Sequence, residues 1–326
     1  MRKVIVIAPI GKTGGVELLH QFAFHLAENY ENVYLKYTQN NYEGTYKFYE
    51  EYTKKIRVSN KISHNDILII PETMPYMLRR YKQNLKFFWW MSVDNLYGTL
   101  NLKNMIATKR FPIFSIKSLI RQDNTKHMVQ SFYAKKHLKD VYEIFDTLDM
   151  TDYINEDFSI KFQKHVTDYD LRDNVILYNP SKGGEEQLQL INLLSQKFKF
   201  LPLVGLTREK MGELMGKSKV YLDLGNHPGK DRIPREAALM GCSIITNTRG
   251  SAGNKFDIPI DKKFKINQYS DNNLKHFSET IDYLFSLRTN DVHYSDYRKK
   301  ILDEKTVFQN EVLKFKMEWL QETYGS

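Results

Sequence analysis

Residues 220–246 read VYLDLGNHPGKDRIPREAALMGCSIIT, and this stretch predicts a strand, a helix and a second strand in succession. Residues 220–224 and 243–246 are apolar and rich in β-branched side chains, as in strands that a parallel sheet buries on both faces. Residues 232–241 have helical spacing, and Asp231 precedes them as an N-cap whose carboxylate accepts a first-turn N–H. The stretch therefore predicts one unit of an α/β sheet.

The same alternation of strand and helix fills most of the chain and restarts once. The predicted strands are residues 4–8, 33–36, 66–71, 86–91, 112–116 and 128–132, then 174–178, 200–204, 220–224 and 243–246. This pattern predicts an α/β protein with two Rossmann-like, doubly wound domains facing each other across a cleft. We expect an N-terminal domain at 1–165 and a C-terminal domain at 166–290. Helices over 291–326 form a tail that caps its own domain or packs back on the first.

Composition places the protein among ordinary soluble chains. Its 326 residues are 41% hydrophobic and 27% charged, and no apolar run approaches the about 20 residues that span a bilayer. The apolar run after the N-terminus breaks at Pro9 and Gly11, which favours a first strand over a secretory signal. Cys242 is the only cysteine, so we expect no disulfide framework and a reducing, cytoplasmic location. The net charge of +9 leaves nucleic acid, an anionic membrane and phosphorylated substrates open as partners.

The loop after the first strand, residues 9–15 (PIGKTGG), imitates a P-loop without matching it. A P-loop needs a glycine at the position of Val6, and the dinucleotide pattern G-x-G-x-x-G is also absent, so we reject both readings. What remains is the pair Gly14 and Gly15 at the start of a helix. Glycines let the backbone approach a ligand closely, and N–H groups at a helix start favour anions. The alternative is a simple tight turn.

Two cations of the second half stand where an anion would fit. Lys182 lies in the turn NPSKGG, after a predicted strand and before a helix, where it meets a diphosphate or is an exposed turn lysine. Arg208 begins the next helix, where a cation opposes the helix dipole. Either a ligand anion explains it, or it pairs with Glu209 or Glu213.

Glu236 lies one turn into the helix of the opening stretch, beside Ala237 and Ala238. These alanines and Gly241 allow the helix to sit close to the sheet. One reading of Glu236 is an i,i+4 pair with Arg232, worth about 0.2–0.5 kcal/mol on a helix surface. The other is a carboxylate that accepts both hydroxyls of a ribose.

Residues 234–245 follow the pattern P-x-E-A-x-x-x-G-C-x-I-I, residues 14–17 read GGVE, and residues 182–183 read KG. Together and in this order they resemble the GT-B fold nucleotide-sugar glycosyltransferases, especially glycosyltransferase family 4. The resemblance implies that Glu236 binds the donor ribose and that Lys182 binds the donor diphosphate. It also implies that the early glycine pair lies near the donor phosphates.

The sequence departs from the family at two positions of the second domain. The first of two family glutamates would fall on Pro228, and an arginine that accompanies the diphosphate lysine would fall near Asn179 or Pro180. Asp231 and Lys230 are the charged residues next to the lost glutamate. Either could serve a different sugar or a different phosphate contact.

In the first domain the resemblance points to Asp94. Family members often carry a histidine and an aspartate after a central strand; here Asp94 matches and the histidine does not. Asp94 is therefore the catalytic candidate, as a base, a sugar ligand or a structural cap. Retention of the anomeric configuration stays open.

The expected activity is transfer of a sugar from a nucleotide-sugar to a hydroxyl of a glycan or lipid-linked acceptor, in bacterial cell-surface polysaccharide synthesis. No metal or other cofactor is expected. Asp168 and Asp170 match the D-x-D motif of other glycosyltransferase folds, but they lie in the predicted hinge, and the histidines lack paired ligand spacing. Basic residues at 79–86 and 109–121 either hold the protein near the inner face of an anionic membrane or form solvated surfaces.

Two other functions stay open. A nucleotide-sugar epimerase would share the fold, but no acidic and histidine set for proton chemistry is identified. A non-catalytic binder of nucleic acid or another polyanion would use the net charge. We expect nucleic acid not to be a partner, because no helix-turn-helix, zinc-finger or RNA-binding motif is present and the basic residues are spread out.

Overall fold

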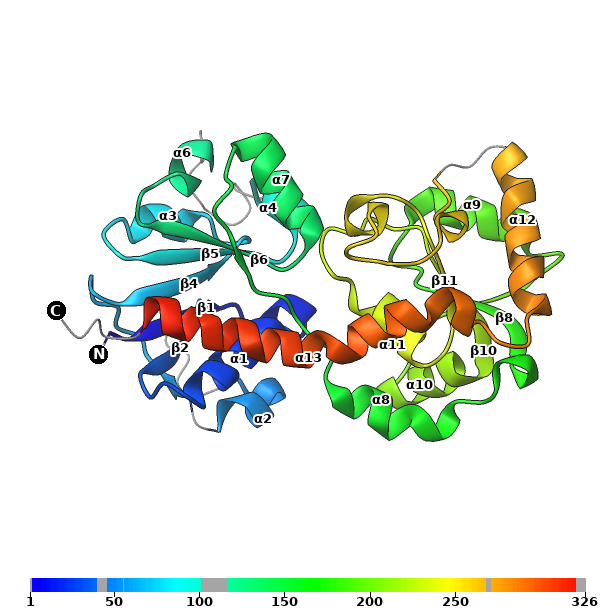
Figure 1. The fold of residues 1–326 in the computed structure, drawn as a ribbon, viewed down its shortest axis with the longest axis horizontal. Coiled ribbons are helices and arrows are strands. Elements are labelled where there is room, and N and C mark those ends of the chain that lie inside the picture. The colour runs from blue at the N-terminus through cyan, green and yellow to red at the C-terminus, as the bar shows by residue number, and fades with distance from the viewer. Residues whose placement is uncertain (1, 40–45, 55, 101–115, 268–270, 321–326) are drawn as a thin grey trace. The chain divides into compact units, whose positions relative to one another are not determined.

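The computed structural model describes residues 2–39, 46–54, 56–100, 116–267 and 271–320. The chain forms two compact units (Figure 1). Unit 1 comprises Met1–Asp152 and Lys305–Ser326, and unit 2 comprises Tyr153–Glu304. Each unit has its own parallel sheet, which confirms the predicted α/β class.

Unit 1 is built on a seven-stranded sheet in the order β3-β2-β1-β4-β5-β6-β7, with every neighbouring pair parallel. The order reverses between β1 and β4, which is the arrangement of a doubly wound sheet. The strands are β1 (Val4–Ala8), β2 (Val33–Tyr37), β3 (Arg57–Val58), β4 (Ile67–Pro71), β5 (Lys86–Trp90), β6 (Thr125–Val129) and β7 (Leu148–Asp149). The central strands β1, β4 and β5 are buried along their whole length, because helices cover both faces.

Helices of unit 1 lie on both sides of this sheet (Figure 1). They are α1 (Gly14–Ala27), α2 (Glu50–Thr53), α3 (Tyr76–Arg80), α4 (Val93–Leu100), α6 (Ile116–Ile120) and α7 (Phe132–Tyr142). Successive side chains of β5 point to opposite faces of the sheet. Phe88 and Trp90 join the core under α3, α4, α6 and α7, whereas the ring of Trp89 contacts Phe22 of α1.

Two strands predicted for this unit are not found at their predicted positions in the described structure. The strand predicted at 128–132 is displaced: β6 ends at Val129 and α7 begins at Phe132, because Ser131 Oγ accepts the N–H of Ala134 at 3.1 Å as an N-cap. Residues 112–115 of the predicted strand at 112–116 lie outside the described ranges, and so do residues 109–115 of the basic segment at 109–121.

Unit 2 is built on a four-stranded parallel sheet in the order β11-β10-β8-β9. Its strands are β8 (Asp173–Tyr178), β9 (Lys199–Pro202), β10 (Ser218–Asp223) and β11 (Ser243–Thr246). Its helices are α8 (Glu156–Phe162), α9 (Gly184–Leu194), α10 (Arg208–Lys217), α11 (Arg232–Leu239), α12 (Asp271–Ser286) and the first half of α13 (Asp291–Trp319).

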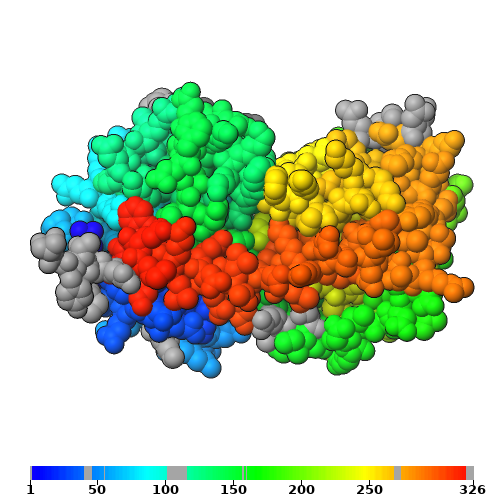
Figure 2. Space-filling model, viewed as in Figure 1, coloured from blue at the N-terminus to red at the C-terminus, as the bar shows by residue number. Residues whose placement is uncertain are grey.

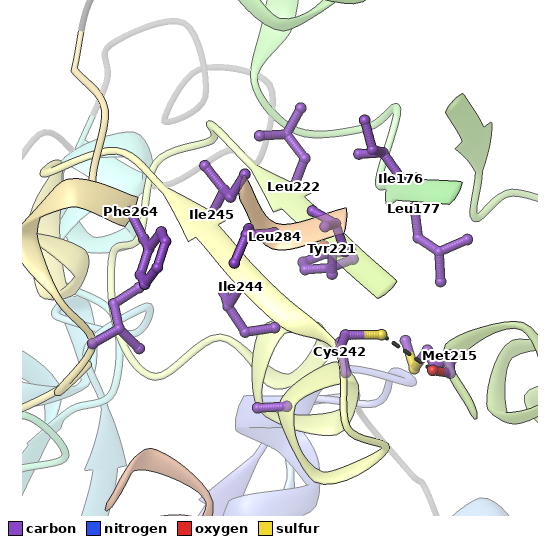
Figure 3. Close-up of a cluster of buried hydrophobic side chains, with 14 of the residues drawn as sticks. Ile176, Leu177, Met215, Tyr221, Leu222, Cys242, Ile244, Ile245, Phe264 and Leu284 are labelled. Atoms are coloured by element: carbon purple, nitrogen blue, oxygen red, sulfur yellow. Dashed lines mark hydrogen bonds between the residues drawn. The ribbon is translucent and has the colours of Figure 1, made fainter. Parts of the chain in front are cut away.

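The core of unit 2 gathers fully buried side chains from three adjacent strands (Figure 3). Cys242 lies at the edge of this core, where its Sγ is 3.1 Å from the carbonyl oxygen of Met215. The core side chains of the strands are Ile176 and Leu177 of β8, Tyr221 and Leu222 of β10, and Ile244 and Ile245 of β11.

The boundaries of the units differ from those expected at 165 and 290. The first lies at Asp152, because α8 packs into unit 2; a Cβ on Gly212 of α10 would lie 2.5 Å from Phe162. The second lies inside α13, after Glu304. Tyr294, in the first half of α13, donates to the carbonyl of Ile244 in unit 2 at 3.0 Å.

The second half of α13 belongs to unit 1 and lies on its surface (Figure 2). Phe315 contacts the rings of Phe22 and Phe87, with centroid separations of 5.4 and 4.9 Å. Glu311 accepts the backbone N–H of Thr151 at 2.6 Å. These contacts bury one side of the helix against the sheet face that α1 also covers.

No helix within the described ranges combines the length and the apolar character needed to cross a bilayer.

Candidate functional site

Two loops of unit 2 meet at the carboxyl ends of neighbouring strands. β8 and β10 pair in parallel, so the turn at 179–183 and the loop at 224–231 leave the sheet side by side. Gly225 permits the approach, because a Cβ there would lie 2.9 Å from Cβ of Lys182 and 3.2 Å from the backbone nitrogen of Gly183. The carboxyl edge of a parallel α/β sheet is the usual place for a ligand.

A buried glutamine, Gln187, holds the turn that carries Lys182, and no sequence pattern pointed to it. Gln187 donates to the carbonyls of Asn179 and Lys182 at 3.0 and 2.9 Å and accepts the N–H of Leu224 at 3.1 Å. Gly183 adopts φ +80°, and a Cβ there would strike Gln187 at 2.5 Å. Glycine is therefore required at this position both for its backbone conformation and for space.

Lys182 and Asp231, both predicted as ligand residues, form an ion pair at the mouth of these loops. The Nζ of Lys182 lies 2.6 Å from Oδ1 of Asp231, and both side chains are partly exposed. Burial raises the pKa of the Asp231 carboxyl, but the opposing effects of His227 and Lys182 exceed it, so the pKa lies below its ordinary value. An anion that binds at Lys182 would therefore have to replace the carboxylate of Asp231.

The expected N-cap role of Asp231 is wrong in one respect. Asp231 occupies the N-cap position of α11, but its side chain makes no capping hydrogen bond. One carboxylate oxygen meets Lys182 instead, and Nδ1 of His227 lies 3.0 Å from the other. The ammonium of Lys182 competes successfully with the neutral N–H groups of the helix start, because charge-assisted contacts are stronger.

Glu236 is buried, and its partner is Arg208 rather than Arg232. Nη2 of Arg208 lies 3.0 Å from Oε1 of Glu236, whose side chain is 2% exposed. Burial raises the pKa of the Glu236 carboxyl, and the Arg208 guanidinium opposes that rise. The pairing of Arg208 with Glu209 or Glu213 is also wrong, since Glu213 takes the lysines of its own helix, Lys210 and Lys217. A carboxylate buried beside a single exposed arginine is the arrangement expected of a ligand-binding group.

Lys230 points to a different partner from the other predicted ligand residues. Its Nζ lies 2.7 Å from Oε1 of Glu304, and Arg235 holds the second oxygen of Glu304 at 2.6 Å. All three side chains are at most 6% exposed. The ammonium of Lys230 therefore anchors the loop at 224–231 to α13, and the structure does not bring it to Lys182.

The glycine pair of unit 1 opens α1 as predicted. Thr13 caps the helix by accepting the N–H of Val16 at 3.4 Å. A Cβ on Gly14 would meet nothing within 4 Å, and one on Gly15 would touch only the end of Met91 at 3.7 Å. Both glycines thus expose their backbone at the carboxyl end of β1.

Asp94 lies in the first turn of α4, directly beyond β5. Its Oδ1 accepts the hydroxyl of Tyr133 at 3.3 Å, and burial together with this carboxylate raises the pKa of Tyr133 to about 12. The side chain of Asp94 is half-buried. Within the described ranges the hydrogen-bond donor to Asp94 is the neutral hydroxyl of Tyr133, so its roles as base or sugar ligand stay predictions.

Glu72 is a buried carboxyl at the carboxyl end of β4 that the sequence did not single out. It is 2% exposed and accepts the N–H of Met91 at 3.2 Å. Burial raises its pKa to about 8, although backbone N–H groups act in the opposite direction. An isolated glutamate just past an apolar strand, at the point where the strand order reverses, is the signal that could have drawn attention to it.

Raising the pH should therefore destabilise the protein through Glu72. Its folded pKa of about 8 exceeds the ordinary 4.5, so its stabilising contribution is complete below 4.5 and is lost as the pH rises through 8. The Glu72→Gln variant keeps the shape without the titration. We expect its thermal midpoint to fall less than that of the unaltered protein between about pH 5 and pH 8.5. If the thermal midpoints of the two proteins change in parallel with pH, Glu72 is not the group responsible for the loss of stability.

Within the described part of the chain, no three His, Cys, Asp or Glu side chains gather as a metal site would require.

No protein-family model matches the chain, and a search of curated proteins finds no match. Solved structures do match over nearly the whole length. HepE from Anabaena, in complex with UDP-glucose, is 12% identical with a TM-score of 0.61, over 97% of this chain and 100% of that one. Sucrose-phosphate synthase from Thermosynechococcus elongatus is 10% identical with a TM-score of 0.57, over 97% and 98%.

A third match is an α-glucosyltransferase in complex with UDP and a 13-mer DNA. It is 12% identical with a TM-score of 0.55, over 97% of this chain and 99% of that chain. At such identities the likeness establishes the fold. The chain therefore has the GT-B fold, the two-domain architecture of nucleotide-sugar glycosyltransferases.

Proposed function

We propose that the protein is a glycosyltransferase that moves a sugar from a nucleotide-sugar to a hydroxyl group of an acceptor. The observation that carries the proposal is the meeting of Lys182 with Asp231, and of Glu236 with Arg208, at the loops and helix starts beyond β8, β9 and β10. Neighbours of the same fold were solved with UDP or UDP-glucose, which supports a nucleotide-sugar donor.

Three residues of unit 2 have separate roles in this proposal: Lys182, Glu236 and Arg208. Lys182 offsets the charge of the donor diphosphate, which grows on the leaving group as the glycosidic bond breaks. Glu236 accepts the ribose hydroxyls, and its burial makes those hydrogen bonds strong because water does not compete for them. Arg208 opposes the rise in the pKa of Glu236 that burial causes, which favours the carboxylate form.

Unit 1 is proposed to contribute Gly14, Gly15 and Asp94. The two glycines offer an open backbone and N–H groups at the start of α1, which suit an anionic group. Asp94 is the candidate to accept a proton or a hydrogen bond from a sugar hydroxyl. The proposed chemistry uses these side chains and requires no metal or other cofactor.

The acceptor proposed is a glycan or a lipid-linked glycan of bacterial cell-surface polysaccharide synthesis, with the protein at the cytoplasmic face of the membrane. Arg79 and Arg80 of α3 are exposed and are among the described basic residues that would meet anionic lipid. The exclusion of nucleic acid is not carried forward, because the α-glucosyltransferase of the same fold was solved with DNA.

Binding of nucleotides to the Glu236→Ala variant tests the proposal. Calorimetric titration measures the binding of nucleoside diphosphates and nucleotide-sugars to the intact protein, and we expect at least one of these compounds to bind. Glu236→Ala should weaken that binding at least about tenfold, since each lost hydrogen bond to a charged group is worth about 1.5–3 kcal/mol.

The matched control is Glu213→Ala, which removes a surface carboxylate of the same unit that pairs only with lysines of its own helix. It should leave the affinity unchanged. If no nucleotide or nucleotide-sugar binds, the proposal is wrong. An epimerised sugar formed from donor alone would replace transfer with epimerisation, and a salt-sensitive shift of nucleic acid without nucleotide binding would indicate a polyanion binder.

A further inference from the structure

A chain of polar side chains runs from the core of unit 2 to Lys182, and its central member is a histidine. His227 has no exposed surface. Its Nδ1 lies 3.0 Å from Oδ2 of Asp231, and its Nε2 lies 3.4 Å from the carbonyl oxygen and 3.7 Å from Oδ1 of Asp223. Nothing in the family resemblance assigns a role to this residue.

Both nitrogens of the His227 ring therefore face acceptors. Nδ1 of His227 and Oδ2 of Asp231 are buried, and neither atom has a hydrogen-bond partner among the described residues, although the two lie 3.0 Å apart. A proton shared between them would satisfy both. A neutral imidazole carries one proton and satisfies one side, whereas the imidazolium donates to both. His227 can therefore bind a second proton on its ring, because an acceptor faces each of its two nitrogens.

The other charged groups around His227 are already matched. Asp223 accepts the N–H of Gly225 at 3.0 Å and the hydroxyl of Tyr221 at 3.2 Å. Burial, and after it the nearby carboxylate of Asp223, raises the pKa of Tyr221, which keeps this tyrosine neutral. Glu236 has Arg208, and Glu304 has both Lys230 and Arg235. Asp231 alone depends on a cation, Lys182, that a ligand would take away.

The backbone holds His227 firmly in this position. The N–H of Ser251 donates to the carbonyl of His227 at 2.8 Å, and Ser251 Oγ donates to the carbonyl of Gly229 at 2.6 Å. Gly250 adopts φ +57°, and a Cβ there would lie 2.0 Å from the His227 carbonyl oxygen. The ring therefore stays beside Asp231 when the partners of Asp231 change.

We infer that His227 is a positioning residue that takes up a proton when a diphosphate binds at Lys182. The diphosphate displaces the Asp231 carboxylate from Lys182 and adds negative charge beside it. A proton from solvent binds the free nitrogen of His227, and the imidazolium then neutralises Asp231 in place of Lys182. The inference rests on the proposed function, because it takes Lys182 as the diphosphate site.

Calorimetric titration with UDP in buffers of different ionisation enthalpy measures the uptake. The intact protein at about pH 7.5 should take up a fraction of a proton more than His227→Gln, since an ordinary histidine is mostly neutral there. Protonation changes of UDP itself cancel in this difference. Asp231→Asn should also lose the uptake and bind UDP about two- to fivefold more tightly, because Lys182 no longer has to leave a carboxylate.

His293→Gln is the matched control, because His293 also faces a carboxylate, Asp261 at 2.7 Å, on the surface of the same unit. Its proton uptake should equal that of the unaltered protein. If His227→Gln takes up as many protons on UDP binding as the unaltered protein, or if Asp231→Asn binds UDP more weakly, this inference is wrong while the proposed function stands. If UDP gives no heat, the same titrations use inorganic pyrophosphate; absence of binding by both overturns the proposed diphosphate site and this inference together.

Discussion

Replacing Glu304 with alanine should lower the free energy of unfolding of unit 2 by about 3–5 kcal/mol, because Lys230 and Arg235 would lose the buried carboxylate that contacts both of them. Lys230 and Arg235 each lie within 2.7 Å of a Glu304 oxygen and are at most 6% exposed. Removing one partner of a buried charge cluster costs more than the cluster itself contributes, because the remaining charges stay desolvated.

The measurement must separate the two units, since a chain of two units need not unfold in one step. All three tryptophans, Trp89, Trp90 and Trp319, lie in unit 1, so their fluorescence reports on that unit. Hydrogen exchange in β8, β10 and β11 reports on unit 2. Glu304→Ala should accelerate exchange in those strands.

A surface charge of the same unit provides the comparison for Glu304. Glu213→Ala also removes a carboxylate that pairs with two cations, but these pairs are exposed, and such pairs are worth about 0–1 kcal/mol. A triple replacement, Lys230→Met with Arg235→Met and Glu304→Leu, should recover most of the loss, because none of the three charges of this cluster then remains buried. Equal effects of Glu304→Ala and Glu213→Ala would show that the buried cluster contributes no more than a surface pair.

The strands and the doubly wound class could be predicted because they depend on local pattern. β11 lies at Ser243–Thr246 and β1 at Val4–Ala8, as their apolar runs indicate, since strands buried on both faces are composed mainly of apolar residues. The boundary of unit 2 within α13 could not be predicted. Helical periodicity shows that one face is apolar and says nothing about which sheet that face covers.

The site could be predicted as a set of residues but not as a set of contacts. Lys182 and Glu236 are predicted from the family resemblance and Asp231 from its place beside the missing glutamate, and the structure brings Lys182 and Asp231 within 2.6 Å. Their true partners come from distant segments: Arg208 reaches Glu236 from another helix, and the loop lysine next to Asp231 turns to α13. Charge pairing is decided by three-dimensional proximity, which spacing within one helix does not encode.

Replacing Lys182 with methionine should weaken nucleoside diphosphate binding about 10- to 100-fold, the equivalent of one or two charge-assisted hydrogen bonds. Methionine keeps the length of the aliphatic stem, so the turn over Gln187 stays in place and the change removes the charge alone. The same variant should leave stability nearly unaltered, since the ion pair with Asp231 is partly exposed. Calorimetric titration measures the affinity, and a thermal midpoint checks the fold.

Lys217→Met is the control for this change, because Lys217 is an exposed lysine of the same unit that pairs with Glu213. It should bind nucleotide as the unaltered protein does, which would exclude a general effect of the net charge of +9. Lys182→Arg separates charge from shape: arginine keeps the cation, but its planar fork does not reproduce the point contact of an ammonium, so partial recovery is expected. Equal weakening by Lys182→Met and Lys217→Met would mean that nucleotides respond to the overall charge of the protein, and Lys182 would lose its place in the site.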